Sequence, residues 1–277
     1  SMGTSGFMID GKNGTEQFGS DVSTAGDFNG DGVADLLVGA GASGGSAYVI
    51  YSNKIQAGTY TSFSDLTTAG ALGLAIHNGG TGFGNSVTNL GDINGDGLSD
   101  VLIGGYGGNN QGTDYVVFGR TDTGSLNIAN LGAGGFKILG DATNNYAYEV
   151  AGAGDVNGDG IADFIIGARG ANAAYVVFGG SSLAGTTINV TSVGSTVAGF
   201  KISASAGNFG FDVSYAGDLN GDGLADVVVG ANTANANGST SGSMYVVYGK
   251  ADNTTVQASN VANGKNRTLY SLRHTCI

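Results

Sequence analysis

Three observations in the sequence predict an all-β protein built from four similar units. A nine-residue acidic segment with the pattern D-x-N-G-D-G-φ-x-D, in which φ is Val, Leu or Ile, occurs four times. Two β-branched apolar runs follow each segment, and an aromatic side chain precedes each one by nine residues. Repetition at a fixed period is the signature of a repeat protein. The segments begin at Asp27, Asp92, Asp155 and Asp218, which are 65, 63 and 63 residues apart.

Each unit is expected to contain four short strands. The aromatic residue opens a strand that leads into the acidic segment, and the two apolar runs after the segment predict the second and third strands. A short apolar run before the aromatic residue predicts a fourth, outer strand. The aromatic residues are Phe18, Phe83, Tyr146 and Phe209, and the outer strands are expected at residues 6–9, 72–76, 135–138 and 199–202.

Four strands separated by turn residues describe an antiparallel sheet. Because the runs are apolar at consecutive residues, both faces of each sheet should be covered. Such sheets stacked around an axis form a β-propeller, which typically has four to eight blades. We therefore expect a β-propeller of four-stranded antiparallel blades, four in number. The strand at residues 7–9 is expected to pair with the last blade as an N-terminal latch strand.

The propeller is expected to span residues 6–255. Its repeats lie at about 6–65, 66–130, 131–195 and 196–255. The remaining residues, 256–277, form a C-terminal tail that breaks the repeat pattern and carries three of the ten cationic residues. This tail is either an authentic final strand or a truncated or foreign end, and the second interpretation is favoured. A closed ring is favoured over an open arc, which would expose sheet faces and would dimerise or aggregate.

The acidic segments offer a cation only oxygen ligands. Carboxylates stand at positions 1, 5 and 9, an amide oxygen at position 3 and a backbone carbonyl at position 7, while Gly at positions 4 and 6 permits a tight turn. This set suits Ca²⁺ better than Mg²⁺, and zinc is disfavoured because no His or Cys accompanies any segment. We expect about four Ca²⁺ ions, one per repeat. The expected ligands are Asp27, Asn29, Asp31, Val33, Asp35, Asp92, Asn94, Asp96, Leu98, Asp100, Asp155, Asn157, Asp159, Ile161, Asp163, Asp218, Asn220, Asp222, Leu224 and Asp226.

Two other interpretations of the segments are less consistent with the pattern. An EF-hand requires a Glu at position 12 and a following helix. Position 12 is apolar in all four copies, inside a run that predicts a strand. Asx- and Gly-rich turns without metal would satisfy one copy, but five ligand positions are shared by four copies. Calcium is therefore the favoured interpretation.

Charge and composition agree with metal sites and exclude some partners. The net charge is −12, and the four segments supply three Asp each, so the remainder of the chain is neutral. An acidic chain without a basic stripe is not expected to bind nucleic acid. No transmembrane run is present, so membrane insertion is not expected. No signal peptide is visible, and the opening Ser-Met resembles a cloning remnant.

The combination of Phe-Gly, the acidic segment and a following Gly-Ala resembles the FG-GAP repeat of integrin alpha-chain propellers and their bacterial relatives. The resemblance covers about residues 6–250. It implies Ca²⁺ bound in loops between the first two strands of each blade. The chain departs from the family in lacking Pro after Gly-Ala and in having Tyr146-Ala147 for Phe-Gly. The family ring usually has seven blades, of which only four are present here.

Two functions are compatible with these features. The first is a calcium-binding extracellular binding or adhesion module that contacts a protein or glycan ligand, located outside the cell, on its surface or in the periplasm. Such modules bind calcium in the range of about 10⁻⁴–10⁻³ M. A closed ring would be a monomer, and an open arc could form a homodimer.

The alternative is a calcium-dependent hydrolase of phosphotriesters, esters or lactones, with the metal held in the central channel. Acidic residues occur before the inner-strand valine in three of the four repeats, and they are the candidate catalytic residues: Asp21, Glu149 and Asp212. Solvated surface carboxylates are the simpler explanation of these three residues.

Overall fold

The computed structural model describes residues 6–11, 16–41, 44–55, 60–61, 72–77, 80, 82–105, 113–140, 149–234 and 241–259. These residues form β-strands joined by loops and short 3-10 helices. The 3-10 helices are η1 (Ser52–Lys54), η2 (Ile128–Asn130), η3 (Gly132–Gly134), η4 (Arg169–Ala171), η5 (Ser181–Leu183) and η6 (Val190–Ser192). The expected all-β fold is confirmed.

The strands form four successive sheets, here called blades 1 to 4, in which neighbouring strands run antiparallel. Blade 1 contains β2 (Phe18–Gly26), β3 (Asp35–Ala40), β4 (Ser46–Ile50) and β6 (Gly73–His77). Blade 2 contains β7 (Ser86–Gly91), β8 (Asp100–Gly105), β9 (Thr113–Val117) and β11 (Gly135–Leu139). Blade 3 contains β12 (Glu149–Gly154), β13 (Asp163–Ala168), β14 (Ala173–Val177) and β16 (Gly199–Ser203). Blade 4 contains β17 (Phe209–Gly217), β18 (Asp226–Ala231) and β19 (Ser243–Val247).

A fifth strand, which the sequence did not predict, extends each of the first three blades. These strands are β10 (Gly124–Asn127), β15 (Thr187–Asn189) and β20 (Val256–Gln257), and they pair in parallel with β6, β11 and β16. Each one follows the third strand of the next blade in sequence. The chain therefore returns to the previous blade before it completes its own, and this return ties neighbouring blades together.

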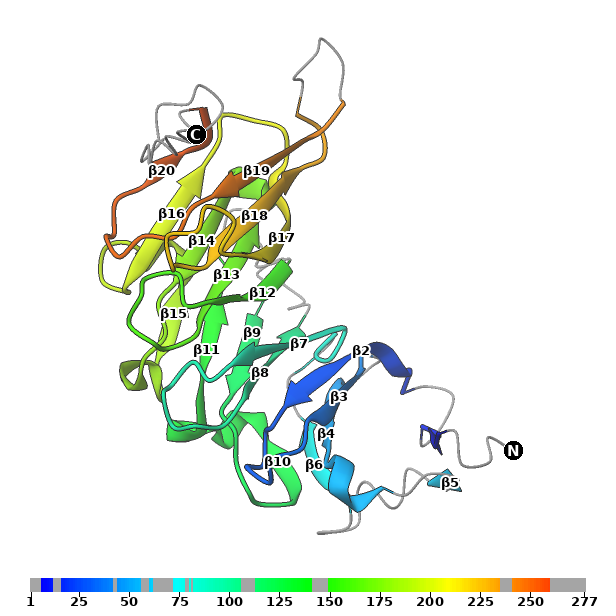
Figure 1. Cartoon of the computed structure of the whole chain (residues 1–277). Coiled ribbons are helices and arrows are strands. Elements are labelled where there is room, and N and C mark those ends of the chain that lie inside the picture. Colours follow the sequence, from blue (N-terminus) through cyan, green and yellow to red (C-terminus); the bar gives the residue numbers. More distant parts are fainter. Residues whose placement is uncertain are drawn as a thin grey trace, which may run out of the picture.

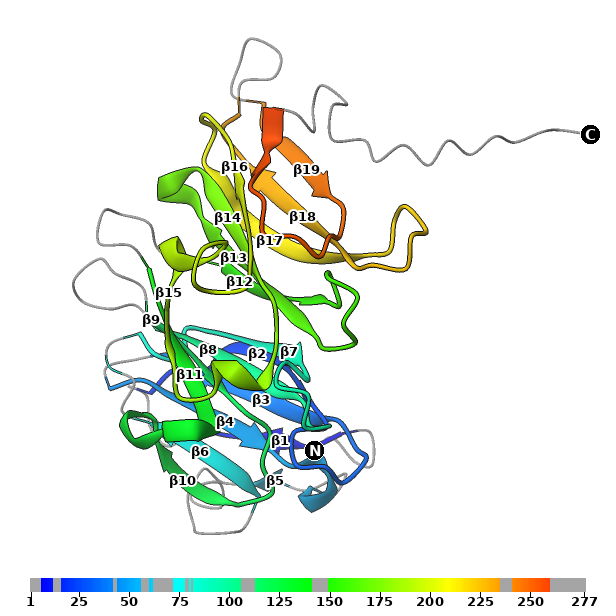
Figure 2. The ribbon, with the colours of Figure 1, turned by 90° about the vertical axis from the view of Figure 1, so that its left-hand side faces the viewer.

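The blades stack in a curved row with β2, β7, β12 and β17 on its concave side (Figure 1). The same order is visible from the side, where each sheet packs on the next (Figure 2). Propeller blades are thus confirmed, but the row does not close into the expected ring of four. Blades 1 and 4 lie at opposite ends, because the turn from each blade to the next is too small for four blades to complete a circle.

The expected N-terminal latch is wrong. Strand β1 (Met8–Ile9) pairs in parallel with β5 (Tyr60–Thr61), a segment of the first repeat, and not with blade 4. Ile9 packs on the outer face of blade 1, against the cluster that contains Val38, Tyr48 and Ile50. Because blade 4 is at the far end of the row, the nearest apolar surface for this strand is that of its own blade.

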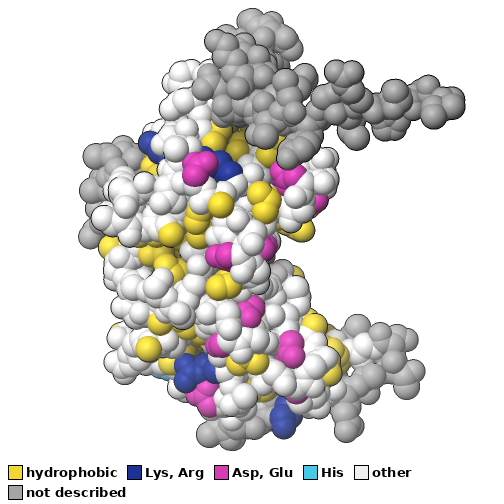
Figure 3. All heavy atoms as spheres, turned by 60° about the vertical axis from the view of Figure 1, so that its left-hand side comes forward, with side chains coloured by type: hydrophobic (Ala, Val, Ile, Leu, Met, Phe, Trp, Pro, Cys, Tyr) yellow, Lys and Arg dark blue, Asp and Glu magenta, His cyan; other side chains and the backbone are white. Residues whose placement is uncertain are grey.

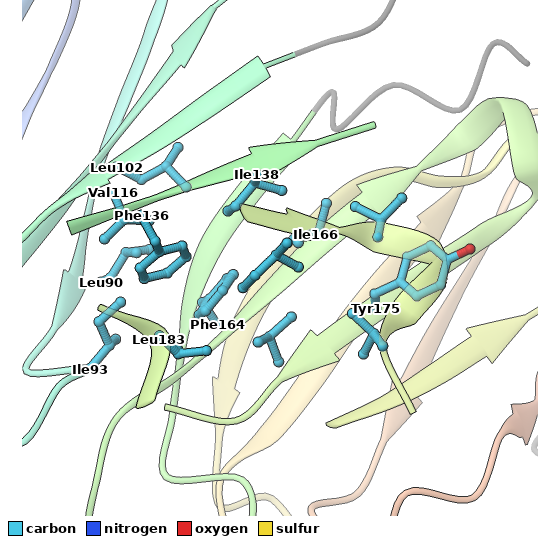
Figure 4. Packing of buried hydrophobic residues seen from close by; sticks show 14 of the residues in the cluster. Leu90, Ile93, Leu102, Val116, Phe136, Ile138, Phe164, Ile166, Tyr175 and Leu183 are labelled. Atoms are coloured by element: carbon cyan, nitrogen blue, oxygen red, sulfur yellow. The ribbon is translucent and has the colours of Figure 1, made fainter. Parts of the chain in front are cut away.

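The hydrophobic core consists of layers between successive blades. Figure 4 shows the layer between blades 2 and 3, where Phe136 and Phe164 face one another with ring centroids 5.8 Å apart. Separate layers lie between blades 1 and 2 and between blades 3 and 4. Consecutive apolar residues in β13 serve two layers, since Phe164 and Ile166 face blade 2 whereas Ile165 faces blade 4.

Some sequence predictions concern other parts of the chain. Tyr146-Ala147 and residues 260–277 lie outside the described residues. The first residues of the proposed tail, Val256–Gln257, form β20 in blade 3.

Candidate metal-binding loops

The four acidic segments form loops that join the first and second strands of each blade. Each loop follows an inner strand and ends at the first residue of the next strand, as at Asp35 and Asp100. The glycines at positions 4 and 6 have positive φ angles in every loop, for example 79° at Gly95 and 90° at Gly97. Only glycine adopts this conformation without strain, which explains why both positions are glycine.

Loop 2 is held by its own hydrogen bonds. The N–H groups of Gly95 and Asp96 donate to Oδ1 of Asp92 over 2.7 and 3.1 Å, and Gly97 donates to its Oδ2 over 2.8 Å. Asn94 accepts from the N–H of Asp96 at 2.8 Å, and Asp96 accepts from Leu98 at 2.9 Å. These bonds aim the polar side chains of positions 1, 3 and 5 toward the interior of the turn. The loop is therefore preorganised.

Loops 3 and 4 repeat this arrangement. Asp155 accepts from Gly158, Asp159 and Gly160, and Asp218 accepts from the three equivalent groups. The backbone N–H groups hold the pKa of Asp218 below its usual range, with Gly223 contributing most. An anionic carboxylate at position 1 of loop 4 is thus favoured before any ion binds.

The ninth position is a buried carboxylate that fastens the loop to the blade. Asp100 accepts from the N–H of Ile93 at 2.9 Å and from that of Gly119 at 2.8 Å. Burial, together with the smaller effect of the nearby Asp96 and Asp92, raises its pKa to about 7. Burial likewise raises the pKa of Asp163 to about 7. A buried charge of this kind requires compensation, which a bound cation would supply.

Loop 1 provides the clearest test of whether a cation fits. Oδ1 of Asp27 and Oδ2 of Asp35 are buried and have no hydrogen-bond partner. Two orphaned carboxylate oxygens in one loop match the hard, oxygen-only ligands that Ca²⁺ prefers.

The described residues contain no compact group of three or more Asp, Glu, His or Cys side chains arranged to hold a metal. Two of the five expected ligands in each loop are not acidic side chains but an amide oxygen and a backbone carbonyl. Several carboxylate oxygens accept hydrogen bonds from backbone N–H groups of the same loop, as Asp92 and Asp96 do in loop 2.

Adjacent loops are connected to one another. The N–H of Ser99 in loop 2 donates to the carbonyl of Asp27 over 3.0 Å, and Ala225 in loop 4 donates to Asp155 over 2.8 Å. Ala162 and Asp92 make the corresponding bond of 3.1 Å between loops 3 and 2. The first residue of loops 1, 2 and 3, an expected ligand, therefore also accepts a backbone hydrogen bond from the following blade. Sequence spacing gave no indication of this link.

Comparison with known proteins agrees with this architecture. A profile of the FG-GAP repeat matches residues 18–50, 146–183 and 209–247, which include loops 1, 3 and 4. The chain belongs to the FG-GAP repeat family. Blade 2, with its own acidic loop, has the same strand order as the matched FG-GAP repeats.

Several relatives of this FG-GAP chain are integrin alpha chains. Integrin alpha-4 of Xenopus laevis is 31% identical over 173 residues, covering 58% of this chain and 15% of that protein. Integrin alpha-V of Gallus gallus is 30% identical over 170 residues, covering 57% and 15%. Integrin alpha pat-2 of Caenorhabditis elegans is 36% identical over 104 residues, covering 34% and 8%. The FG-GAP chain thus spans only a small part of the length of these relatives.

The three candidate catalytic residues of the FG-GAP chain lie on inner strands of different blades. Partial burial raises the pKa of Glu149 on β12, and the charges of Asp212 on β17 and Asp21 on β2 raise it further. Asp21 and Asp212 thus each lie within electrostatic range of Glu149. Asp21 already has a structural role, since its Oδ2 accepts from the N–H of Val87 in blade 2 at 2.8 Å. Figure 3 shows acidic side chains in separate small groups along the row and not as one continuous patch.

A fourth acidic residue was missed by the sequence analysis. Asp114 on β9 is buried, its Oδ1 accepts a long 3.4 Å bond from Gly105, and its Oδ2 has no partner. Burial, supplemented by Glu149, raises its pKa to about 8. The alignment of the repeats contained a signal for Asp114, because the equivalent positions of blades 1 and 3 are occupied by the small apolar residues Ala47 and Ala174.

Proposed function

We propose that this FG-GAP chain is a calcium-binding β-propeller unit that serves as an extracellular binding or adhesion module for a protein or glycan ligand. The observation that carries the proposal is the set of four preorganised oxygen-rich loops. Loop 1 adds two buried carboxylate oxygens without partners. The family relationship supports the same class of function, because the matched relatives are named integrin alpha chains.

Calcium would stabilise the row of blades as well as each loop. A cation held by Asp92 would be coupled to blade 3 through the Asp92 carbonyl and the N–H of Ala162. Each ion at 100 times its dissociation constant adds about 2.7 kcal/mol to stability. Loops of this kind are suited to calcium-rich surroundings, which favours a location outside the cell. Among the described residues, no helix has the length and apolar character to cross a bilayer.

A groove beside loop 2 is the most suitable place for ligand contact. It has a volume of about 650 Å³ and is lined by Asn94, Asp96 and Arg120 together with apolar side chains such as Leu126. Arg120 forms an ion pair with Asp122, so the groove contains both a cationic and an anionic group next to the loop. A polar ligand in this groove would contact the calcium loop directly.

The test combines metal binding with ligand binding. Calcium titration followed by tyrosine fluorescence, which the 12 Tyr and absence of Trp make straightforward, should show saturation in the micromolar to millimolar range. Immobilised glycans and extracellular matrix proteins should then retain the chain in calcium but not in chelator. Arg120→Glu should lose retention with unchanged calcium binding, whereas Lys201→Glu, on β16 of blade 3 and not part of the groove lining, should not. Failure to bind calcium, or equal retention in chelator, would reject the proposal.

A second candidate, the calcium-dependent hydrolase, is supported only by the electrostatic interaction of Glu149 with Asp21 and with Asp212. Because Asp21 also bonds Val87, its replacement would disturb the contact between blades 1 and 2. Glu149→Gln and Asp212→Asn are therefore the informative variants. Calcium-dependent turnover of chromogenic esters or phosphotriesters that both variants abolish would favour the hydrolase. Turnover that neither variant changes would remove these residues from consideration.

A further inference from the structure

Every acidic loop carries an asparagine at position 3 and a glycine at position 4. The glycine is exposed in all four loops, and the residue before the asparagine is apolar. An asparagine side chain is open to attack by the backbone nitrogen of a following glycine, because glycine has no Cβ to obstruct the approach. Neither sequence nor exposure separates the four pairs, which are Asn29-Gly30, Asn94-Gly95, Asn157-Gly158 and Asn220-Gly221.

In loops 2, 3 and 4, two hydrogen bonds hold the pair in place. The glycine N–H donates to Oδ1 of the Asp at position 1 over 2.7 Å in each of these loops. The asparagine Nδ2 donates to Oδ2 of the Asp at position 5 over 2.9, 3.0 and 2.8 Å. Both bonds must break before the glycine nitrogen can turn toward the asparagine Cγ and before the side-chain amide can leave.

Loop 1 differs from the other three in both of these bonds. Oδ1 of Asp27, the acceptor that the glycine uses in the other loops, is buried without a partner, so the N–H of Gly30 does not donate to it. Asn29 still accepts from the N–H of Asp31 at 2.9 Å, but among the described residues its Nδ2 makes no bond with that carboxylate. Asn29 and Gly30 are therefore the least restrained of the four pairs.

We propose that Asn29 is a site of spontaneous deamidation, which proceeds through a cyclic imide formed with Gly30 and is faster there than at the other three pairs of the folded chain. Crowding by the next blade does not explain the difference between the loops. A Cβ on Gly30 would lie 2.8 Å from Leu98, and a Cβ on Gly158 would lie 2.8 Å from Leu224. Loops 1 and 3 thus make the same contact with the following blade and differ in the hydrogen bonds of the reacting groups.

The reaction needs only water as a second reactant. The backbone nitrogen of Gly30 forms a bond to Cγ of Asn29, the Cγ–Nδ2 bond breaks, and the amide group leaves as ammonia with the proton of the Gly30 N–H. Water then adds to one of the two imide carbonyl carbons and opens the ring. Opening at Cγ gives aspartate at position 29, whereas opening at the main-chain carbonyl carbon gives isoaspartate, in which the main chain runs through the former side chain.

Either product changes a loop that joins blade 1 to blade 2. Aspartate adds a carboxylate to the expected cation ligands of loop 1, and isoaspartate lengthens the main chain of the turn by a methylene group. The carbonyls of Asp27 and Phe28, just before Asn29, accept bonds of 3.0 and 2.9 Å from the N–H groups of Ser99 and Arg120. Deamidation therefore alters both the ligand set of loop 1 and its attachment to the next blade as the protein ages.

Peptide mapping of the folded and the unfolded chain tests the site. Both samples are incubated at mildly alkaline pH, one native by circular dichroism and one in guanidinium chloride, and mass spectrometry follows the exchange of amide for carboxylate at each of the four asparagines. In the native chain Asn29 should react about tenfold faster than the other three, because two fewer hydrogen bonds must be broken. In guanidinium chloride all four should react at similar rates. Equal rates in the native chain would overturn the proposal, and so would a preference for Asn29 that persists on unfolding.

Asp92→Ala tests the assigned cause. It removes the acceptor of the Gly95 N–H in loop 2 and should raise the rate at Asn94 in the native chain. Asn157 in the same molecules should keep its rate, which reports that the blades remain folded. Asn29→Gln is the control for loop 1, because the longer side chain disfavours closure of the imide ring, and it should abolish the fast reaction. An unchanged rate at Asn94, or a fast reaction that survives Asn29→Gln, would overturn the proposal.

Discussion

Blades 3 and 4 contain nearly the same sequence pattern but have opposite environments. In blade 3, Val176 and Phe178 are buried against blade 4. In blade 4 the equivalent Val246 is half-buried and Tyr248 is exposed, although the strands and the acidic loop are formed in the same way. The repeat sequence therefore specifies a blade, whereas the burial of its faces depends on having a neighbour. Stability should consequently be distributed unevenly along the row.

Calcium removal should produce the largest effect and shows whether loops or apolar layers hold the row together. At about 2.7 kcal/mol per site at 100 times the dissociation constant, chelation of all four loops removes on the order of 10 kcal/mol. We expect the melting temperature to fall by more than 15 °C in chelator. Asp159→Ala, in an interior loop, should show part of this loss. A melting temperature that is insensitive to chelator would show that the apolar layers alone suffice.

The comparison of equivalent aromatic residues should give the next largest effect. Phe178→Ala removes a buried ring that contacts Phe200 at a centroid distance of 6.0 Å and should cost about 3 kcal/mol. Tyr248→Ala at the exposed site should cost less than about 1 kcal/mol. Both variants are measured by urea unfolding of the otherwise unchanged chain. Equal costs would mean that the face of blade 4 that carries Tyr248 is covered in solution.

The layer between blades 2 and 3 contains Asp114, so its contribution to stability should depend on pH. Its pKa is about 8 in the folded protein and 3.8 ordinarily, so the neutral form is favoured on folding. The resulting stability is fully present below pH 3.8 and is lost as pH rises toward 8. Asp114→Asn stays neutral, so its stability relative to wild type should increase between pH 5 and 8, by up to about 1.4 kcal/mol per pH unit. Unfolding at saturating calcium measures this difference in stability. A difference that does not change with pH would show that the pKa of Asp114 is not raised in the folded protein.

The smallest expected effect compares glycines in loops 3 and 4. Gly158 and Gly221 have φ angles of 81° and 77°, so alanine is strained at either site by about 1 kcal/mol. A Cβ on Gly158 would also lie 2.8 Å from Leu224 of the next blade, whereas a Cβ on Gly221 would meet no atom within 4 Å outside its chain neighbours. Gly158→Ala should therefore be the more destabilising variant in thermal unfolding. The reverse order would indicate that loop 4 is covered more closely than loop 3.

Much of the fold was predictable because its signals are local. Runs of consecutive, largely β-branched apolar residues located β3, β8, β13 and β18, and the paired glycines located the loops. The fifth strand was not predictable, since β10 and β15 are short and partly exposed and pair with a distant segment in parallel. Asp114 was missed for a related reason: its burial depends on the blade that packs over it, and no property of its own strand reveals that contact.

The sequence by itself determined the blade as a unit and the acidic loop within it, because strand alternation, glycine φ angles and ligand spacing depend on residues close together in the chain. Tertiary structure alone decided how the blades are arranged. The turn between blades arises from the packing of whole faces, so the row remained open where four repeats suggested a closed ring. The same packing placed β1 on blade 1, since an apolar strand occupies whatever apolar face lies within its reach.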